Sequence, residues 1–328
     1  MGKMDVNVFF DLKEIFHLNG NILGVIEYGK NKTKSIELKS NLPYQFIQMG
    51  NIEKNIYEVW FTDETVIYKQ IGSCMEGKSF HYCFRAIEEN DSEGKYSENA
   101  EKAYRNILKE LNFNIFRVVR FWNYIPKINE YGESDEHYKE FCIGRERAFY
   151  NFYKKHGEVY PAATGIGSSG KKLCIVLLAV HVDVSRYSIE NPRQVPAYEY
   201  PLKFGNSSPK FSRATYVHYK KSKILFLSGT ASIIGSSSVY DGDVEKQVHT
   251  TVENISLLFS KENLNKHSLI LDDNNMKLRY VKVYIKNWED YERICGICEK
   301  YFDKEKIFYM QSDVCRKELL VEIEGIWT

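Results

Sequence analysis

The chain has 328 residues, of which 43% are hydrophobic and 27% charged, and its formal net charge is +1. This composition fits a soluble globular protein of one or two domains; it disfavours a nucleic-acid-binding protein, which would carry a basic excess, and a membrane protein, which would need a run of roughly 18 apolar residues. The N-terminal residues form no apolar signal core, and the seven cysteines fit free thiols, so we expect a cytoplasmic protein.

The first half of the chain shows a regular order of predicted elements. Two strands at 21–28 and 57–62 come first, and we expect them to be additions to the first domain. They are followed by a strand at 79–85, a helix at 98–111, a strand at 115–124, a helix at 136–155 and strands at 160–166 and 172–182. The glycine-containing segment 164–170 is predicted as a hairpin turn between the last two strands.

The second half repeats this order. It shows a strand at 223–234, a helix that begins after Asp243 as N-cap, a strand at 278–285, a second helix around 288–302, and strands near 307–311 and 319–326. The repetition predicts an α+β fold of two domains, 1–182 and 211–328, each a mixed sheet with helices packed on one face. The uncovered sheet faces must then pack on each other or on another chain, so a monomer and a small homo-oligomer are both open.

Segment 183–210 joins the two halves and contains four of the seven prolines, which predicts a stiff, extended connection. In the second half, Cys295 and Cys298 form a CxxC motif, but no second cysteine or histidine pair completes a tetrahedral site. We therefore interpret both as core-facing residues of a helix and expect no metal site. No phosphate-binding or dinucleotide-binding glycine loop is found either, so we expect no cofactor.

The terminal strand places carboxylates where apolar side chains are usual. Because strand side chains alternate between faces, Val321 and Ile323 point one way, while Leu320, Glu322 and Glu324 point the other. The second face meets either solvent or a polar pocket. Arginines recur at element ends and inside strands, and as a group they suggest a ligand with carboxylates, whose geometry fits the guanidinium fork.

Several segments, in this order, together resemble the chorismatase family, whose members remove the enolpyruvyl group of chorismate as pyruvate. They are Arg120–Pro126, Gly144–Phe149, Pro161–Ser168, Glu190–Tyr198, Ser212–Thr215, Ser228–Ser232, and Cys315-Arg316 ahead of Val321–Glu324. The resemblance implies two fused RidA/YjgF-like (chorismate mutase-like) domains. It also implies that the C-terminal domain carries most of the active site.

The resemblance also implies roles for single residues. Glu322 would be the acid that protonates the methylene carbon of the enol ether, with Glu324 as the fallback. The substrate-binding residues would be Arg213 and Arg316 as carboxylate clamps, Arg147, Arg120 and Arg193 as further arginines, Tyr198 beside the ring, and Cys315 and Ala231 in the pocket wall. The product would be a dihydroxycyclohexadiene carboxylate or 3-hydroxybenzoate, and Cys315 beside the acid favours the latter.

The chain departs from the family pattern at Ser236, Tyr240 and Thr250, which puts the product and the substrate in doubt more than the fold. One alternative is therefore the same scaffold acting on another chorismate-like substrate or on an imine. An imine deaminase of the RidA type would need an arginine where this chain has Ile307. The other alternative is a non-catalytic module that binds a small carboxylate.

Overall fold

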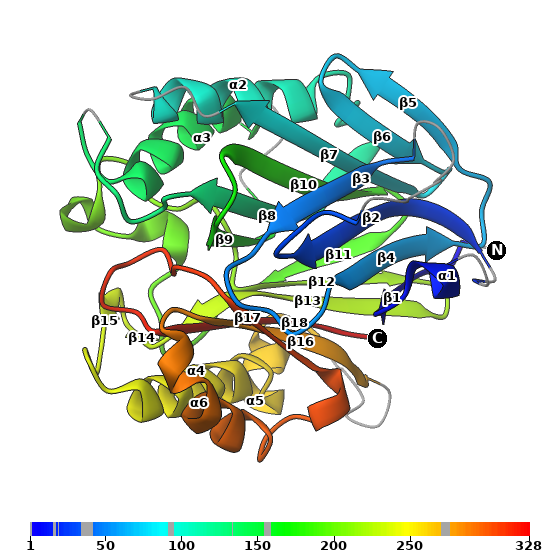
Figure 1. Cartoon of the computed structure of the whole chain (residues 1–328). Coiled ribbons are helices and arrows are strands. Elements are labelled where there is room, and N and C mark those ends of the chain that lie inside the picture. The colour runs from blue at the N-terminus through cyan, green and yellow to red at the C-terminus, as the bar shows by residue number, and fades with distance from the viewer. Residues whose placement is uncertain are drawn as a thin grey trace.

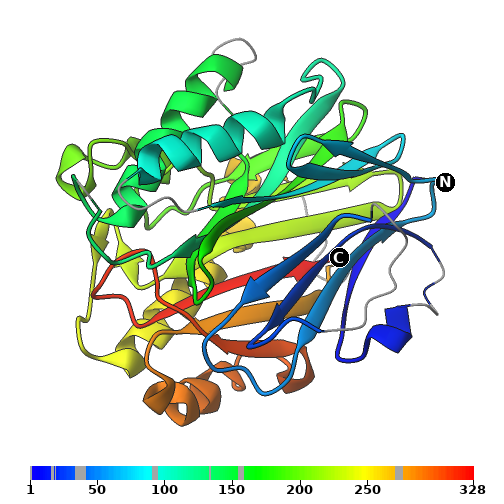
Figure 2. The same ribbon diagram turned by 45° about the horizontal axis from the view of Figure 1, so that its top comes forward.

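The computed structural model describes residues 2–15, 18, 20–33, 42–90, 95–132, 134–153, 159–269 and 276–328. Three larger sheets share the interior, and the longer helices lie on the outside (Figures 1 and 2). Among the described residues, no helix is both long and apolar enough to cross a membrane.

The first sheet has four strands in the order β1-β4-β2-β3, namely β1 (Met4–Phe9), β4 (Ile56–Thr62), β2 (Asn21–Gly29) and β3 (Tyr44–Gln48). One face of this sheet packs into the interior, and the other packs against a small cluster near α1 (Leu12–Ile15). Successive residues of β2, such as Val25 and Ile26, are therefore both buried. These strands form a sheet of their own instead of extending the second sheet.

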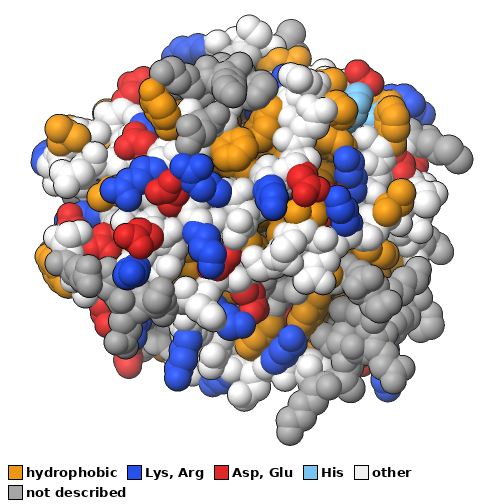
Figure 3. Space-filling view, turned by 90° about the horizontal axis from the view of Figure 1, so that it is seen from above, with side chains coloured by type: hydrophobic (Ala, Val, Ile, Leu, Met, Phe, Trp, Pro, Cys, Tyr) orange, Lys and Arg blue, Asp and Glu red, His pale blue; other side chains and the backbone are white. Residues whose placement is uncertain are grey.

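The second sheet has six strands in the order β5-β6-β7-β10-β8-β9. They are β5 (Ile67–Ile71), β6 (Cys74–Lys78), β7 (Tyr82–Asn90), β10 (Lys172–His181), β8 (Phe116–Pro126) and β9 (Ala162–Ser168). Helices α2 (Tyr96–Leu108) and α3 (His137–Tyr153) cover its outer face. Figure 3 views this side of the molecule, where charged side chains of both signs lie among scattered hydrophobic ones.

The third sheet repeats this topology in the order β11-β12-β13-β18-β16-β17. Its strands are β11 (Ser185–Ile189), β12 (Ala214–Tyr219), β13 (Ser222–Ala231), β18 (Val321–Trp327), β16 (Leu278–Ile285) and β17 (Ile307–Gln311). Its outer face is covered by α4 (Val244–Leu258), α5 (Lys261–Lys266) and α6 (Tyr291–Cys298). A two-stranded hairpin of β14 (Ile233–Ile234) and β15 (Ser237–Ser238) follows β13, and the 3-10 turns are η1 (Ala197–Glu199), η2 (Leu202–Phe204), η3 (Trp288–Asp290) and η4 (Lys304–Lys306).

The predicted α+β fold with mixed sheets is confirmed, as are the repeated order of elements and the coverage of each six-stranded sheet by helices on one face. The N-cap is also confirmed, because the Asp243 carboxylate accepts from the Lys246 N–H at 3.1 Å. The last two residues of the helix predicted at 136–155 lie outside the described residues. Of the CxxC motif, Cys298 is buried, whereas Cys295 is partly exposed and donates to Glu299 at 3.0 Å.

Three local predictions differ from the structure. The hairpin predicted at 164–170 is wrong, because 164–168 lies inside β9, and β8 separates β9 from β10 in the sheet. Segment 183–210 is more than a connection, since Ser185–Ile189 forms β11, a short polar edge strand with little alternation to reveal it. Leu320 lies just before β18 and packs on the helix side, away from the face of Glu322.

The inner faces of the three sheets meet in one core. Trp60 of the first sheet lies 5.7 Å from Trp122 of the second and 5.8 Å from Phe226 of the third, measured between ring centroids. The edge strand β9 joins the second sheet to the third, because the backbone N–H of Ala162 donates to Thr215 Oγ1 at 2.8 Å and that of Ala163 to Ser228 Oγ at 3.0 Å. The duplicated sheets are therefore held face to face along β9.

Helices α2 and α3 approach each other at Gly144. A Cβ at this position would lie 2.0 Å from the Ser97 carbonyl oxygen and 2.8 Å from the Ala100 Cβ. We expect Gly144→Ala to lower the free energy of unfolding by about 2 kcal/mol or more. Gly296→Ala is the matched control in α6, where a Cβ meets no atom within 4 Å, and it is expected to raise stability by about 0.5–1 kcal/mol. Urea denaturation measures both, and equal effects would contradict the close approach.

Candidate active site

The terminal strand β18 divides its side chains as the sequence predicts. Val321 and Ile323 pack under the helices of the third sheet, whereas Glu322 and Glu324 point to the interior that the sheets share. Both carboxyl groups are almost fully buried, at 4% and 1% exposure. The face opposite the helices is therefore a polar interior site and not solvent.

Glu322 lies in a small chamber of about 30 Å³. Half of its lining residues come from the first half of the chain and half from the second: Tyr138, Arg145, Ala163, Gly165, Phe211, Gly229, Cys315 and Glu322 itself. The pairing of β13 with β18 shifts between Leu227 and Thr230, so a bulge adjoins the carboxyl group. A Cβ on Gly229 would lie 1.9 Å from Glu322 Oε1, so only glycine leaves room for the carboxyl group there.

The Glu322 carboxyl has no hydrogen bond or ion pair to any residue that the structure describes. Burial raises its pKa to about 8, and the negative charge of Glu324 adds to this effect, whereas Arg120 and Arg213 oppose it. Desolvation dominates because the chamber offers the ionised form no direct partner. Glu322 therefore keeps its proton at neutral pH.

Glu324 has the opposite environment. Its Oε1 accepts from Lys282 Nζ at 2.5 Å and from Tyr284 OH at 2.8 Å, and its Oε2 accepts from Arg120 Nη2 and Thr164 Oγ1. Burial alone would raise its pKa, but Lys282 and Arg120 outweigh burial and lower the pKa. Glu324 is therefore an ionised member of a buried charge network. Lys282 and Thr164 were not singled out in the sequence, because their contacts join strands that are far apart in the chain.

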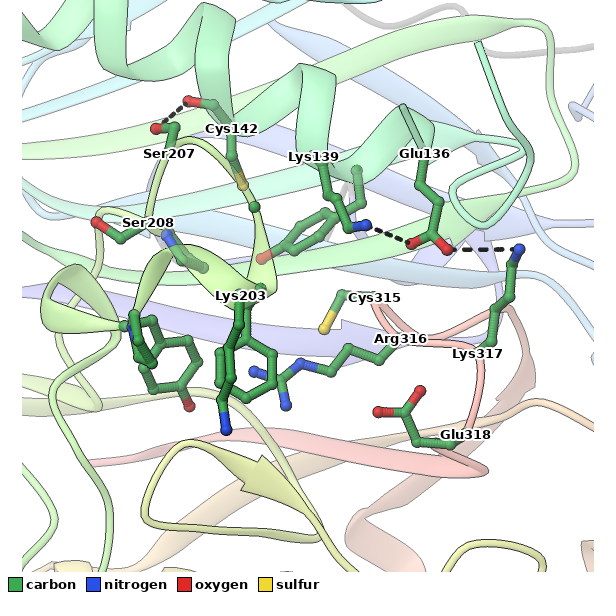
Figure 4. Close-up of a pocket in the computed structure, with 16 residues that line it drawn as sticks. Glu136, Lys139, Cys142, Lys203, Ser207, Ser208, Cys315, Arg316, Lys317 and Glu318 are labelled. Atoms are coloured by element: carbon green, nitrogen blue, oxygen red, sulfur yellow. Dashed lines mark hydrogen bonds and ion pairs between the residues drawn. The ribbon is translucent and has the colours of Figure 1, made fainter. Parts of the chain in front are cut away.

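A larger pocket of about 250 Å³ lies outside the chamber and shares Tyr138 and Cys315 with it. Figure 4 shows Cys315 and Arg316 extending into this pocket from the loop between β17 and β18. The Arg316 guanidinium lies 4.1 Å from the ring centroid of Phe204, and its Nη1 donates to the Ser236 carbonyl at 3.0 Å. Lys139, Lys203 and Lys317 also line the pocket, together with Glu136 and Glu318, so its wall carries an excess of cations.

The loop that carries Cys315 and Arg316 is fixed from several sides. Gln247 of α4 donates to the Glu318 carbonyl at 2.8 Å and accepts from the Leu320 N–H at 2.8 Å. Asn129 donates to the Val314 carbonyl at 2.7 Å. These bonds hold Cys315 at the boundary between the pocket and the chamber.

The structure places Arg147, one of the predicted binding residues, away from both cavities. Its side chain is 53% exposed on the outside of α3 and lies 3.9 Å from Glu101. Arg145, two residues earlier, is 2% exposed and lines the chamber, and its Nε has no hydrogen-bond partner in the described structure. The spacing in the sequence indicates this burial. Arg145 lies four residues after Phe141 and four before Phe149, so it shares a helix face with two rings of the core.

The remaining predicted residues are spread around the site. Arg213 is buried and donates to Tyr200 OH at 2.7 Å, and its Nε has no hydrogen-bond partner among the residues that the structure describes. Tyr198 packs against Tyr160, at 5.3 Å between centroids, and lines neither cavity. Ala231 lies across from Glu322 in the sheet, but its side chain belongs to the shared core. Arg193 pairs with Glu253 on α4 at 2.7 Å, away from both cavities.

Comparisons with known proteins agree with this geometry. A family model described as "Chorismatase FkbO/Hyg5-like, N-terminal" matches residues 58–179, and one described as "Endoribonuclease L-PSP" matches residues 207–327. A 3-hydroxybenzoate synthase of Streptomyces hygroscopicus is 36% identical over 314 residues, which cover 93% of this chain and 91% of that protein. The chain belongs to the chorismatase family.

Further similarities cover nearly the whole chain. A chorismatase of Streptomyces hygroscopicus is 29% identical and covers 93% of this chain and 89% of its own length. The crystal structure of a chorismatase superposes with a TM-score of 0.86 at 27% identity, covering 100% of this chain and 98% of the other. The predicted family is thus confirmed, and the protein is a member of an enzyme family.

The raised pKa of Glu322 makes a prediction for stability. The unfolded chain releases this proton near pH 4.5, whereas the folded chain keeps it up to about pH 8, so the folded state loses stability as pH rises between these values. Glu322→Gln removes this loss and is expected to raise the free energy of unfolding by roughly 4 kcal/mol at pH 8, with little change at pH 4. Denaturation at both pH values checks this; an equal effect at the two would contradict the raised pKa.

Proposed function

We propose that the protein cleaves the enolpyruvyl ether of chorismate, releasing pyruvate, with Glu322 as the general acid. The observation that carries the proposal is a buried carboxyl with no hydrogen-bond or ion-pair partner among the described residues, whose pKa burial raises to about 8. Protonation of a carbon atom needs an acid that still holds its proton at the working pH, and few side chains do so. Membership in the chorismatase family supplies the substrate class.

In the proposed reaction, the Glu322 proton goes to the methylene carbon of the enol ether. The adjacent carbon becomes an oxocarbenium-like centre, and its positive charge is met by the Glu322 carboxylate that the transfer leaves behind. An oxygen nucleophile then adds to this centre, and the ether bond to the ring breaks as pyruvate forms. If the nucleophile is water, one of its protons returns to Glu322 and the other passes to the ring oxygen as the hemiketal breaks down to pyruvate. If the nucleophile is the ring hydroxyl, its proton returns to Glu322, and the ring C–H proton lost on aromatisation is balanced by the proton that the remaining ring oxygen takes up. The acid is restored for the next turnover in both cases.

The two cavities suggest how the substrate is oriented. The outer pocket has room for the six-membered ring, whereas the chamber admits only a few atoms, such as the methylene end of the enolpyruvyl group. We propose that Arg145 receives the enolpyruvyl carboxylate, and that Arg316 and the neighbouring lysines attract the ring carboxylate. Tyr138 and Cys315, which line both cavities, would then flank the ether bond.

Glu324 does not fit the role of the fallback acid. It accepts four hydrogen bonds or ion pairs in a closed network and lines neither cavity. Its lowered pKa means that it carries no proton to give at neutral pH. We propose instead that the negative charge of Glu324 helps to raise the pKa of Glu322.

We propose 3-hydroxybenzoate as the ring product. Cys315 at the wall of the chamber and the 36% identical 3-hydroxybenzoate synthase both favour it. The alternative, a dihydroxycyclohexadiene carboxylate, contains one more molecule of water. The ring product therefore tells whether water or a group of the ring traps the oxocarbenium-like centre.

The alternatives from the sequence have less support. For an imine deaminase, Ile307 occupies the arginine position, and its side chain is buried under the helices of the third sheet, on the face away from Glu322. A binding module without catalysis would have no need for a protonated carboxyl in its ligand site. Such a module would hold chorismate without releasing pyruvate.

The direct test is to incubate the protein with chorismate, without added metal or cofactor. We expect pyruvate, measured by a coupled assay, and 3-hydroxybenzoate, identified by chromatography. Glu322→Gln is expected to lower kcat by at least about 100-fold, because it removes the general acid. Folded protein that binds chorismate but releases no pyruvate would overturn the proposal in favour of the binding module, and absence of binding would favour another substrate.

Arg145 and Arg147 offer a matched pair on one helix. Arg145→Gln removes the proposed partner of the enolpyruvyl carboxylate and is expected to lower kcat/KM by roughly 10- to 100-fold. Arg147→Gln makes the same chemical change on the exposed side of α3 and should leave kcat/KM within about twofold. Melting temperatures of both variants separate an effect on the site from unfolding. Equal kinetics of the two variants would remove Arg145 from the site.

A further inference from the structure

The ion pairs around Glu324 extend to the first sheet, which contributes no residue to either cavity beside Glu322. Lys282 of β16 contacts Glu324 at 2.5 Å and Glu58 of β4 at 2.8 Å. Glu58 is held in turn by Trp60 Nε1 at 2.9 Å and by Tyr28 OH at 3.1 Å. A continuous chain of polar contacts thus joins a strand of the first sheet to the strand that carries the proposed acid.

This network is balanced in charge, and the buried Arg120 Nη1 has no hydrogen-bond partner among the described residues. Its two carboxylates, Glu58 and Glu324, face two cations, Lys282 and Arg120, and each of the four residues is at most 2% exposed. Lys282 is shared by both carboxylates, and Arg120 is engaged by Glu324. In the described part of the chain, neither cation forms an ion pair with Glu322, which lies two residues from Glu324 on the same face of β18.

Few other charges act on Glu322 from the elements packed around it. Glu324 lies on its own strand, Arg120 on β8, Arg213 just before β12, and Tyr138 and Arg145 on α3, while Cys315 lies in the preceding loop. None of these groups makes an ion pair or hydrogen bond with the Glu322 carboxyl in the described part of the chain. The charge balance of the neighbouring network therefore has a direct influence on whether Glu322 holds its proton.

We infer that Glu58 and Lys282 are positioning residues for the proposed acid. They act through Glu324: Lys282 holds it ionised and in place beside Glu322, and Glu58 cancels the charge that Lys282 would otherwise add. The first sheet thus has a role in the chemistry although it lines neither cavity. The inference rests on the proposed function, in which Glu322 is the acid.

Charge-changing variants test this by the sign of their effects. Glu58→Gln leaves the network with a net positive charge, which favours loss of the Glu322 proton. A unit charge on the order of 10 Å away in a protein interior shifts a titration by roughly one pH unit. In the pH profile of kcat/KM, the alkaline limb is therefore expected to move to lower pH by up to about one unit. The double variant of Glu58→Gln with Lys282→Met is neutral again and is expected to return the limb close to its original position.

Two further variants keep the test decisive. Glu324→Gln also leaves a net positive charge, but closer to Glu322, so a larger shift in the same direction is expected even if Glu58→Gln does not fold. Glu253→Gln is the control, because Glu253 is 62% exposed in a surface ion pair with Arg193. The alkaline limb of the pH profile of this variant should not move. The inference is overturned if active Glu58→Gln shows no shift, or if the double variant keeps the full shift of the single one.

A readout that needs no turnover separates this inference from the proposed function. Infrared difference spectra of protein with and without Glu322→Gln report the protonation of this carboxyl directly during a pH titration. If the pKa of Glu322 shifts with the charge of the network but the protein releases no pyruvate, the inference is retained and the acid role is rejected. If the protein releases pyruvate but the pKa of Glu322 is the same in all the charge variants, the acid role is retained and the inference is rejected.

Discussion

The structure depends on the need of three open sheet faces to cover one another. Each six-stranded sheet has helices on one side only, and the first sheet completes the enclosure, with Trp60 in contact with a ring from each of the other two. Polar groups on these inner faces lose their water and must find partners within the protein. The ion pairs among Glu58, Lys282, Glu324 and Arg120 give each of these four buried charges a partner of opposite sign.

Glu322 is not part of this network of ion pairs. It is buried beside the network and receives no hydrogen bond from the described residues, so it stays neutral by keeping its proton. A carboxyl in this condition weakens the folded state at neutral pH, because the unfolded chain would ionise it. A feature that costs stability fits a residue kept for chemistry more readily than one kept for folding.

The sequence was informative where a pattern is local. The alternation of β18 revealed which face carries the two carboxylates, and the repeated order of elements predicted the paired sheets. It could not divide the roles of Glu322 and Glu324, because their difference comes from Lys282 and Thr164, which lie on other strands. Arg145 and Arg147 differ in a way that the sequence does contain, because only Arg145 lies four residues from both Phe141 and Phe149 and so falls on the buried face of the helix.

The position of the chamber explains why the two halves have to be one unit. The proposed acid comes from the third sheet, while Arg145 and Tyr138 come from the helix on the second sheet and Ala163 and Gly165 from its edge strand β9. Neither half contains both the acid and these cavity walls, and the hydrogen bonds of β9 to the third sheet hold them together. Chemistry at this seam therefore requires the docking of the two sheets, which in turn requires the first sheet to close the shared core.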